Sequence, residues 1–295
     1  MIKNNIKNSF IKPLNILWFF LLPITWFLGT ASVRSNILFL ERALKTALAS
    51  PEQFSIEQAR NRLTAVNGFT VFLEGSSDFY VSVAVVLLAG LIFSSSFAYD
   101  KNTGFGNFIL SRIDYKKYFC LKSLVTFFTP FVFTFLTMSA ILFYSLLKYS
   151  DTVPTEEFAF SMNKESASFG FFISYYWTSC FIIIFTLSLI SGIYALLGMG
   201  INAFTSNRFV ISIFPVSLII LLTLIPQIFP INTVMAKAMA WFFPSYLTGV
   251  FIGNSYWYTN LPPAQAYLIH IVVLAIPAIV LLSVLYIENK KQYVR

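Results

Sequence analysis

Ionisable residues are scarce in this sequence. Of its 295 residues only 11% are Asp, Glu, Lys or Arg, one is histidine and two are cysteine, while 57% are hydrophobic. That balance is typical of a membrane protein. Cys120 lies near the end of one apolar run and Cys180 inside another, so neither is placed to form an extracellular disulfide. We interpret both as apolar packing residues.

Motifs that carry chemistry are missing as well. The segment Gly104-Phe105-Gly106 lacks both the spacing and the Lys-Ser/Thr pair of a phosphate-binding loop. The sequence also has no metal-ligand cluster, no G-x-S-x-G elbow and no H-E-x-x-H helix. We therefore expect no catalytic, cofactor-binding or metal-binding residue in this chain, and no enzymatic activity of its own.

Six apolar runs are long enough to cross roughly 30 Å of hydrocarbon as helices. They are residues 14–33, 80–98, 123–147, 170–197, 209–229 and 264–287. The sequence thus predicts an all-α integral membrane protein with six transmembrane helices in a single domain. None of these runs contains Asp, Glu, Lys or Arg, whereas carriers driven by an ion gradient usually need such groups inside the membrane. His270 is the sole ionisable candidate, either as a relay or as an ordinary hydrogen-bonded residue.

The distribution of Lys and Arg indicates the orientation of the spans. If both termini are cytoplasmic, the inner segments hold twelve basic and three acidic residues, and the outer segments hold eight and nine. The net charge of +8 is therefore a consequence of topology, and it does not indicate nucleic-acid binding.

A cytoplasmic insert, residues 99–122, joins the second and third spans. Phe105, Phe108, Ile109 and Arg112 follow the spacing i, i+3, i+4, i+7, which places side chains on one face of a helix. Two interpretations are open. The helix either fits into a groove of another protein, or it lies flat among lipid headgroups with its basic residues on phosphate.

The insert also contains signals for helix boundaries. Asn102 or Thr103 is expected to cap the first helix, and Asp114 a second short helix. The second helix repeats the same spacing with the residues Tyr115, Tyr118, Phe119 and Lys122.

Two outer segments interrupt the spans. Residues 34–79 carry two helical patterns and are predicted to form a helical hairpin over the outer surface. Residues 231–263 are aromatic and broken by proline and glycine, which is typical of re-entrant half-helices. The residues that we assign to this outer gate are Trp241, Phe243, Pro244 and Tyr246.

These features together resemble the permease subunits of ABC-2-type ATP-binding-cassette exporters. The six-span layout is similar, and the insert resembles the coupling helix of that family at Asp100, Gly104, residues 108–112, Tyr118 and Lys122. The segment Pro244-Ser245-Tyr246 is similar to the family's re-entrant outer helices. The resemblance covers nearly the whole chain through loose motifs in the same order. The long outer loop 34–79 departs from the family pattern.

The resemblance implies a mechanism and a set of partners. Two permease chains, identical or related, would pair in the bacterial plasma membrane, and each would bind a separate ATPase subunit that holds ATP-Mg. The coupling helices would transmit the closure of the ATPase pair to the spans. Phe105, Phe108 and Ile109 would insert into the ATPase, and Arg112 and Lys116 would orient the contact.

The cargo and the function class have alternatives. Uncharged spans and 34 phenylalanines suit a hydrophobic or amphipathic substrate such as a peptide, toxin, drug or lipid, although most of these rings would also suit lipid or helix contacts. The alternative to an exporter is a non-transporting immunity or sensor subunit whose insert recruits a cytosolic partner. A secondary carrier is a further rival.

Overall fold

Helices make up the described part of the chain. The computed structural model describes residues 94–148, 174–228, 234–242 and 261–293, and isolated positions at 23, 24, 27, 31, 34, 35, 38, 69, 89 and 247. No strand occurs among these residues. The predicted all-α class is therefore confirmed for this part of the chain. The first span, the outer loop and most of the second span lie outside it, apart from those isolated positions.

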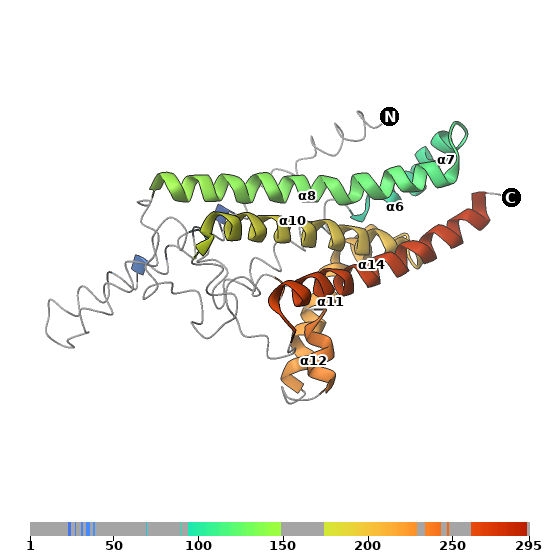
Figure 1. The fold of residues 1–295 in the computed structure, drawn as a ribbon. Coiled ribbons are helices and arrows are strands. Elements are labelled where there is room, and N and C mark those ends of the chain that lie inside the picture. The colour runs from blue at the N-terminus through green and yellow to red at the C-terminus, as the bar shows by residue number, and fades with distance from the viewer. Residues whose placement is uncertain are drawn as a thin grey trace, which may run out of the picture.

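Figure 1 shows the order of the helices along the chain. They are α6 (Ser96–Asn102), α7 (Phe105–Leu110), α8 (Tyr115–Lys148), α10 (Tyr176–Gly200), the short 3-10 helix η4 (Ile201–Ala203), α11 (Arg208–Ile228), α12 (Val234–Ala240) and α14 (Pro263–Tyr293).

Three helices, α8, α10 and α14, are long and apolar enough to cross a membrane. They contain the predicted third and sixth spans and most of the fourth, and they make this chain a membrane protein. With 34 residues, α8 rises about 50 Å, well beyond the roughly 30 Å of a hydrocarbon core. It runs unbroken from Tyr115, so the predicted separate short helix is wrong. The reason is that neither glycine nor proline occurs between Tyr115 and Pro130 to end it.

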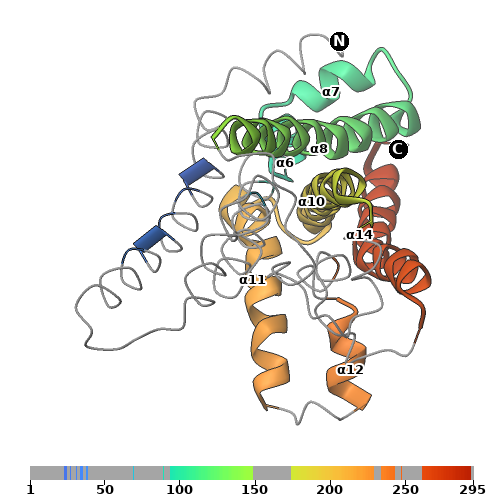
Figure 2. The same ribbon diagram turned by 60° about the vertical axis from the view of Figure 1, so that its left-hand side comes forward.

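The helix at the centre of the packing is α10. Of its most apolar stretch 72% is buried inside the chain, against 44% for α8 and 22% for α14. It contacts α8, α14 and α11, and Figure 2 shows it between α8 and α14. It ends at Gly200, and the chain continues directly into η4.

The fifth predicted span is a helix, but it is not aligned with the others. Figures 1 and 2 show α11 running across the direction of α8, with α12 beside its far end. The inner side of α11 still joins the bundle, because Val216 and Ile219 pack with Ile190 and Tyr194 of α10.

The sixth span ends near the insert. The helix α14 continues past Ile287 to Tyr293, and Figure 1 shows its final turns close to α6 and α7. The count of six spans and the cytoplasmic placement of both termini stay predictions.

Candidate functional site

The insert contains the end of α6, the whole of α7 and the start of α8, and a tight turn joins α6 to α7. Gly104 stands at the start of α7 with φ +70°, a left-handed conformation that suits glycine. The predicted caps are wrong here, since neither side chain bonds to the start of α7. Thr103 Oγ1 donates to the carbonyl oxygen of Tyr99 at 2.8 Å, and Asn102 Nδ2 donates to that of Ser206 at 3.4 Å.

Two phenylalanines project from α7. Phe105 is 43% exposed and Phe108 54%, and their rings stack with centroids 6.4 Å apart. We call this pair the aromatic knob. The guanidinium carbon of Arg112 lies 4.4 Å from the centroid of the Phe108 ring, within reach of a cation–π contact. Lys116 is exposed on the first turn of α8. Four of the five predicted coupling residues are therefore accessible.

Ile109, the fifth predicted coupling residue, is turned into the chain. It is 5% exposed and packs in a core cluster whose other members are Phe97, Tyr115, Tyr118, Met199 and Leu285. We call this cluster the base of the knob. Tyr115 and Tyr118, from the predicted second helix, are members of it, and Phe119 packs against it. The spacing predicted that Ile109 shares a face with the two phenylalanines. Because α7 has only six residues and packs against the chain on one side, part of that face is buried.

The base of the knob also contacts the end of α14. The ring of Tyr286 lies 5.4 Å from that of Tyr115 and 5.3 Å from that of Phe119, between centroids. Lys101 Nζ donates to Asn289 Oδ1 at 3.5 Å. The insert is thus attached to a helix that begins about 140 residues after the insert ends.

A buried ion pair in the insert is the feature that sequence reasoning missed. Lys122 Nζ lies 2.7 Å from Asp100 Oδ2, and the Tyr118 hydroxyl donates to the same oxygen at 2.9 Å. The Lys122 and Asp100 side chains are 9% and 7% exposed. The sequence places Lys122 among the cytoplasmic basic residues without a partner. The sequence did contain one indication of this pair. Asp100 and Lys122 have opposite charges and stand at the two ends of the insert, where it meets the flanking apolar runs.

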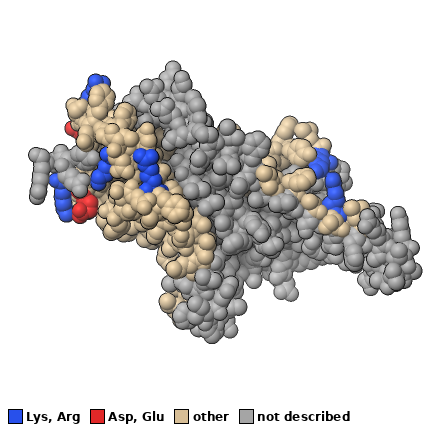
Figure 3. Space-filling view, turned by 180° about the vertical axis from the view of Figure 1, so that it is seen from behind, with Lys and Arg blue, Asp and Glu red and all other residues tan. Residues whose placement is uncertain are grey.

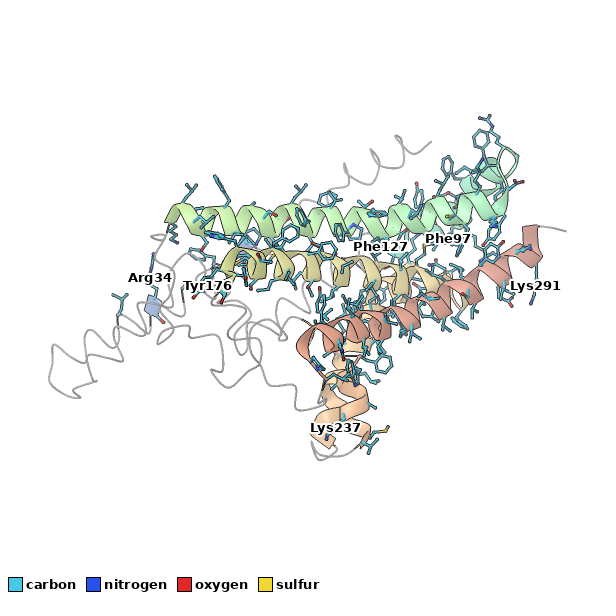
Figure 4. All side chains as sticks on the ribbon, in the orientation of Figure 1. Arg34, Phe97, Phe127, Tyr176, Lys237 and Lys291 are labelled. Atoms are coloured by element: carbon cyan, nitrogen blue, oxygen red, sulfur yellow. The ribbon has the colours of Figure 1, made fainter. Side chains whose placement is uncertain are left out.

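The turn between α10 and α11 meets the insert too. Asn102 reaches Ser206, and the guanidinium carbon of Arg208 lies 4.7 Å from the centroid of the Tyr99 ring. Three segments that the charge pattern assigns to the cytoplasm therefore gather at one end of the structure. Figure 4 shows Phe97 and Lys291 toward this end, and Tyr176 at the opposite end of α10.

Exposed positive charge is concentrated at this end. The exposed basic residues of the three segments are Lys101, Arg112, Lys116, Lys117, Arg208, Lys290 and Lys291. Among the described residues of these three segments the exposed acids are Asp114 and Glu288, and Glu288 accepts from Lys291 at 3.2 Å. Figure 3 shows most of the basic side chains of the visible face gathered over one end. The positive electrostatic potential at this end favours the binding of acidic groups, either on a protein or on lipid.

No protein-family model, curated protein or solved structure matches this chain. Its function is therefore argued from the geometry of the chain.

The predicted outer gate lies largely outside the described residues. Phe243, Pro244 and Tyr246 fall there, so their assignment stays a prediction. Trp241 is half-buried, and its ring centroid lies 5.6 Å from that of His270, which is fully buried. The structure therefore brings together the two polar aromatic residues that the sequence analysis placed in different segments.

Groups of three or more His, Cys, Asp or Glu side chains that could hold a metal ion do not occur in the described part of the chain. Both cysteines are free thiols. Cys120 is exposed near the start of α8, while Cys180 is buried in α10 and fills apolar space there.

Proposed function

We propose that this chain is the permease subunit of an ABC-2-type exporter in the bacterial plasma membrane. Two such chains, identical or related, pair in the membrane. They move a hydrophobic or amphipathic substrate, such as a peptide, toxin, drug or lipid, out of the cell. A separate ATPase subunit on the cytoplasmic side holds ATP-Mg and supplies the energy, and the insert receives its movement.

The observation that carries this proposal is the aromatic knob on its fixed base. Phe105 and Phe108 are exposed, while Ile109 on the same short helix anchors it to α8 and α14. Large aromatic side chains that are exposed on a rigid support are typical of protein contact sites, where they fill pockets of a partner. Arg112 and Lys116 beside the knob suit an acidic rim around such a pocket.

A helix that lies flat among headgroups fits this geometry less well. Such a helix buries one continuous apolar face in the membrane and is not otherwise anchored. In α7 the apolar residues divide between two directions, because Ile109 packs inside the chain and the phenylalanines face away from it. This division favours a protein partner.

The source of energy supports the same proposal. From Ser123 to Leu147, and from Tyr176 to Asn207, the chain contains no Asp, Glu, Lys or Arg. The buried ion pair stands at the entrance to the first of these stretches. Uncharged spans leave no group to bind and release a coupling ion within the membrane, so a secondary carrier is disfavoured. An external ATPase removes that need.

The alternative function is a non-transporting immunity or sensor subunit. It uses the same knob to recruit a cytosolic partner, and it predicts a partner without a phosphate-binding loop. The identity of the protein bound to the knob therefore separates the two functions.

The test is affinity purification of the full chain in mild detergent from its native membrane. We expect an ATPase with a G-x-x-x-x-G-K-[ST] loop to co-purify. Phe108→Asp should abolish its recovery, because a carboxylate would be buried unpaired in an apolar pocket.

The matched control is Phe204→Asp. Phe204 is 68% exposed at the end of η4, at the same end of the structure but outside α7. Recovery of the ATPase should be unaffected by this change, and both variants should accumulate in the membrane like the unmodified chain. The proposal fails if the ATPase is absent, or if it is recovered equally with Phe108→Asp.

A further inference from the structure

The position of α7, and so of the aromatic knob, is set by the end of α6. Gly106 of α7 is buried, and a Cβ atom built there would lie 3.4 Å from the carbonyl oxygen of Asp100. Helices of six residues are not stable in isolation, because the free-energy cost of nucleating the first turn exceeds the stabilisation from so few hydrogen bonds. The helix α7 therefore lies where the backbone around Asp100 and the packing of Ile109 place it.

Asp100 is held in turn by α8. One carboxylate oxygen, Oδ2, accepts from both Lys122 Nζ and the Tyr118 hydroxyl, and all three groups are buried. Removal of either charge would leave the other buried without an opposite charge beside it, which is strongly unfavourable. The link between the end of α6 and α8 thus persists as long as the fold is intact.

Lys122 stands at the junction between the insert and the membrane-crossing part of α8. It lies four residues after Tyr118 and seven after Tyr115, so all three share one helical face. After it come 25 residues without charge. Tyr118 and Lys122, which bind Asp100, therefore lie on the same continuous helix as the part of α8 that crosses the membrane.

Stability alone does not explain a buried ion pair at this place. Apolar residues of similar volume often stabilise a buried site equally well. An ion pair adds direction, since two donors aimed at one oxygen fix both the distance and the orientation of the joined helices. The joint at Asp100 is short and directional, whereas the α14 side is held by ring contacts with Tyr286 and by the longer hydrogen bond of 3.5 Å from Lys101 to Asn289.

We propose that Asp100, Lys122 and Tyr118 are positioning residues that join α6, α7 and the start of α8 into one rigid lever. Movement imposed on the aromatic knob is transmitted through this joint to α8 in preference to α14. The lever itself is a property of the chain, whereas its use in transmission rests on the proposed function.

The lever is tested by hydrogen exchange of the full chain in detergent. In Lys122→Met we expect the amides of residues 104–113 to exchange about tenfold faster, because the joint that orients α7 is lost. Exchange in the middle of α8 should be unchanged. The matched control is Lys117→Met, which removes an exposed charge from the same helix and should leave residues 104–113 as they are.

Unchanged exchange of residues 104–113 in Lys122→Met would overturn the proposal. If that variant does not fold, Tyr118→Phe replaces it, since this change removes one hydrogen bond and keeps the ring in the core cluster. It should accelerate exchange of the same amides by a smaller factor. Equal exchange in Tyr118→Phe and the unmodified chain would then be the contradicting result.

Transmission is tested on the complex with the co-purified ATPase. Leu147 is 71% exposed at the far end of α8, and Leu147→Cys, in a chain without the native cysteines, reports movement there through its rate of maleimide labelling. We expect ATP with vanadate to change this rate. The change should disappear in Lys122→Met while the ATPase stays bound, and it should persist in Lys122→Arg, which keeps the charge.

The two proposals fail in different ways. If no ATPase co-purifies with the unmodified chain, the proposed function is wrong, and hydrogen exchange still decides whether the lever exists. If the ATPase binds and Lys122→Met responds to ATP with vanadate like the unmodified chain, the joint does not transmit movement.

Discussion

Buried hydroxyl groups show how single polar residues are accommodated in this bundle. Thr129, Thr137, Thr186 and Ser188 each donate to the carbonyl oxygen four residues earlier, at 2.7 to 2.8 Å. Such local bonds satisfy a hydroxyl in a medium without water and leave helix contacts to packing. Thr186 does more, since its oxygen also lies 2.7 Å from the Tyr267 hydroxyl of α14.

The contact between Thr186 and Tyr267 should contribute little free energy. We expect Tyr267→Phe to lower the free energy of unfolding in detergent micelles by about 0.6 kcal/mol, and at most about 1.7 kcal/mol, the range for hydrogen bonds between membrane helices. Thr186 retains its local bond in the variant, so no buried hydroxyl loses its only partner. Tyr144→Phe, at an exposed position of α8, is the control and should have a smaller effect. A loss above about 3 kcal/mol would show that the contact is part of a larger network.

Packing of α8 against α10 is the main contact between elements. Phe131 lies against Phe185 and Phe135 against Phe181, with centroids 5.7 and 6.0 Å apart, so the two helices run antiparallel. The ring of Phe127 packs directly against the backbone at Gly192. Ser188 and Gly192 are small residues four positions apart on α10, a spacing that does not by itself indicate which helix packs on them. Apolar association has little driving force inside lipid, so close approach at small residues decides how these helices fit.

Gly192→Val should weaken this contact. A Cβ atom at this position would lie 2.6 Å from Phe127 Cε2 and 3.1 Å from the Phe127 carbonyl oxygen, so both the ring and the backbone of α8 must shift. Overpacking of this kind costs about 1 to 3 kcal/mol. Thermal unfolding in detergent measures the loss, and Thr178→Val, an exposed position of the same helix, should leave stability nearly unchanged. An equal stability for both variants would contradict the close fit of α8 on Gly192.

At the scale of the whole molecule, most exposed Lys and Arg residues of the described part gather at one end. The insert, the turn after α10 and the end of α14 meet at the basic end, through Lys101 with Asn289 and Asn102 with Ser206. These contacts join segments separated by more than 100 residues. They agree with the orientation that the Lys and Arg pattern predicts, in which all three segments lie on the cytoplasmic side.

Labelling of single cysteines tests this orientation. In a chain with both native cysteines replaced, Ser111→Cys places an exposed thiol in the insert, and Tyr175→Cys places one at the opposite end beside α10. We expect a membrane-impermeant maleimide to label the first only in inside-out vesicles and the second only in right-side-out vesicles. Labelling of both thiols from the same side would show that the bundle does not span the membrane as proposed.

Prediction from the sequence succeeded where a feature depends on neighbours along the chain. The helices of the third and sixth spans, and of most of the fourth, follow from runs of apolar residues. The direction of α11 did not follow, because an apolar helix has the same pattern whether it runs along its neighbours or across them. The burial of Ile109 did not follow either, since periodicity defines a face but not which part of it another element covers.

The amino-acid order by itself determined that this is a helical membrane protein whose long apolar runs contain no Asp, Glu, Lys or Arg. Only the tertiary structure decided that Asp100 and Lys122 form a buried pair and that the aromatic knob stands on a base shared by α8 and α14. The physical reason is the range of the interactions involved. Hydropathy and helix boundaries act within a few turns, whereas an ion pair and a ring stack depend on where distant segments meet.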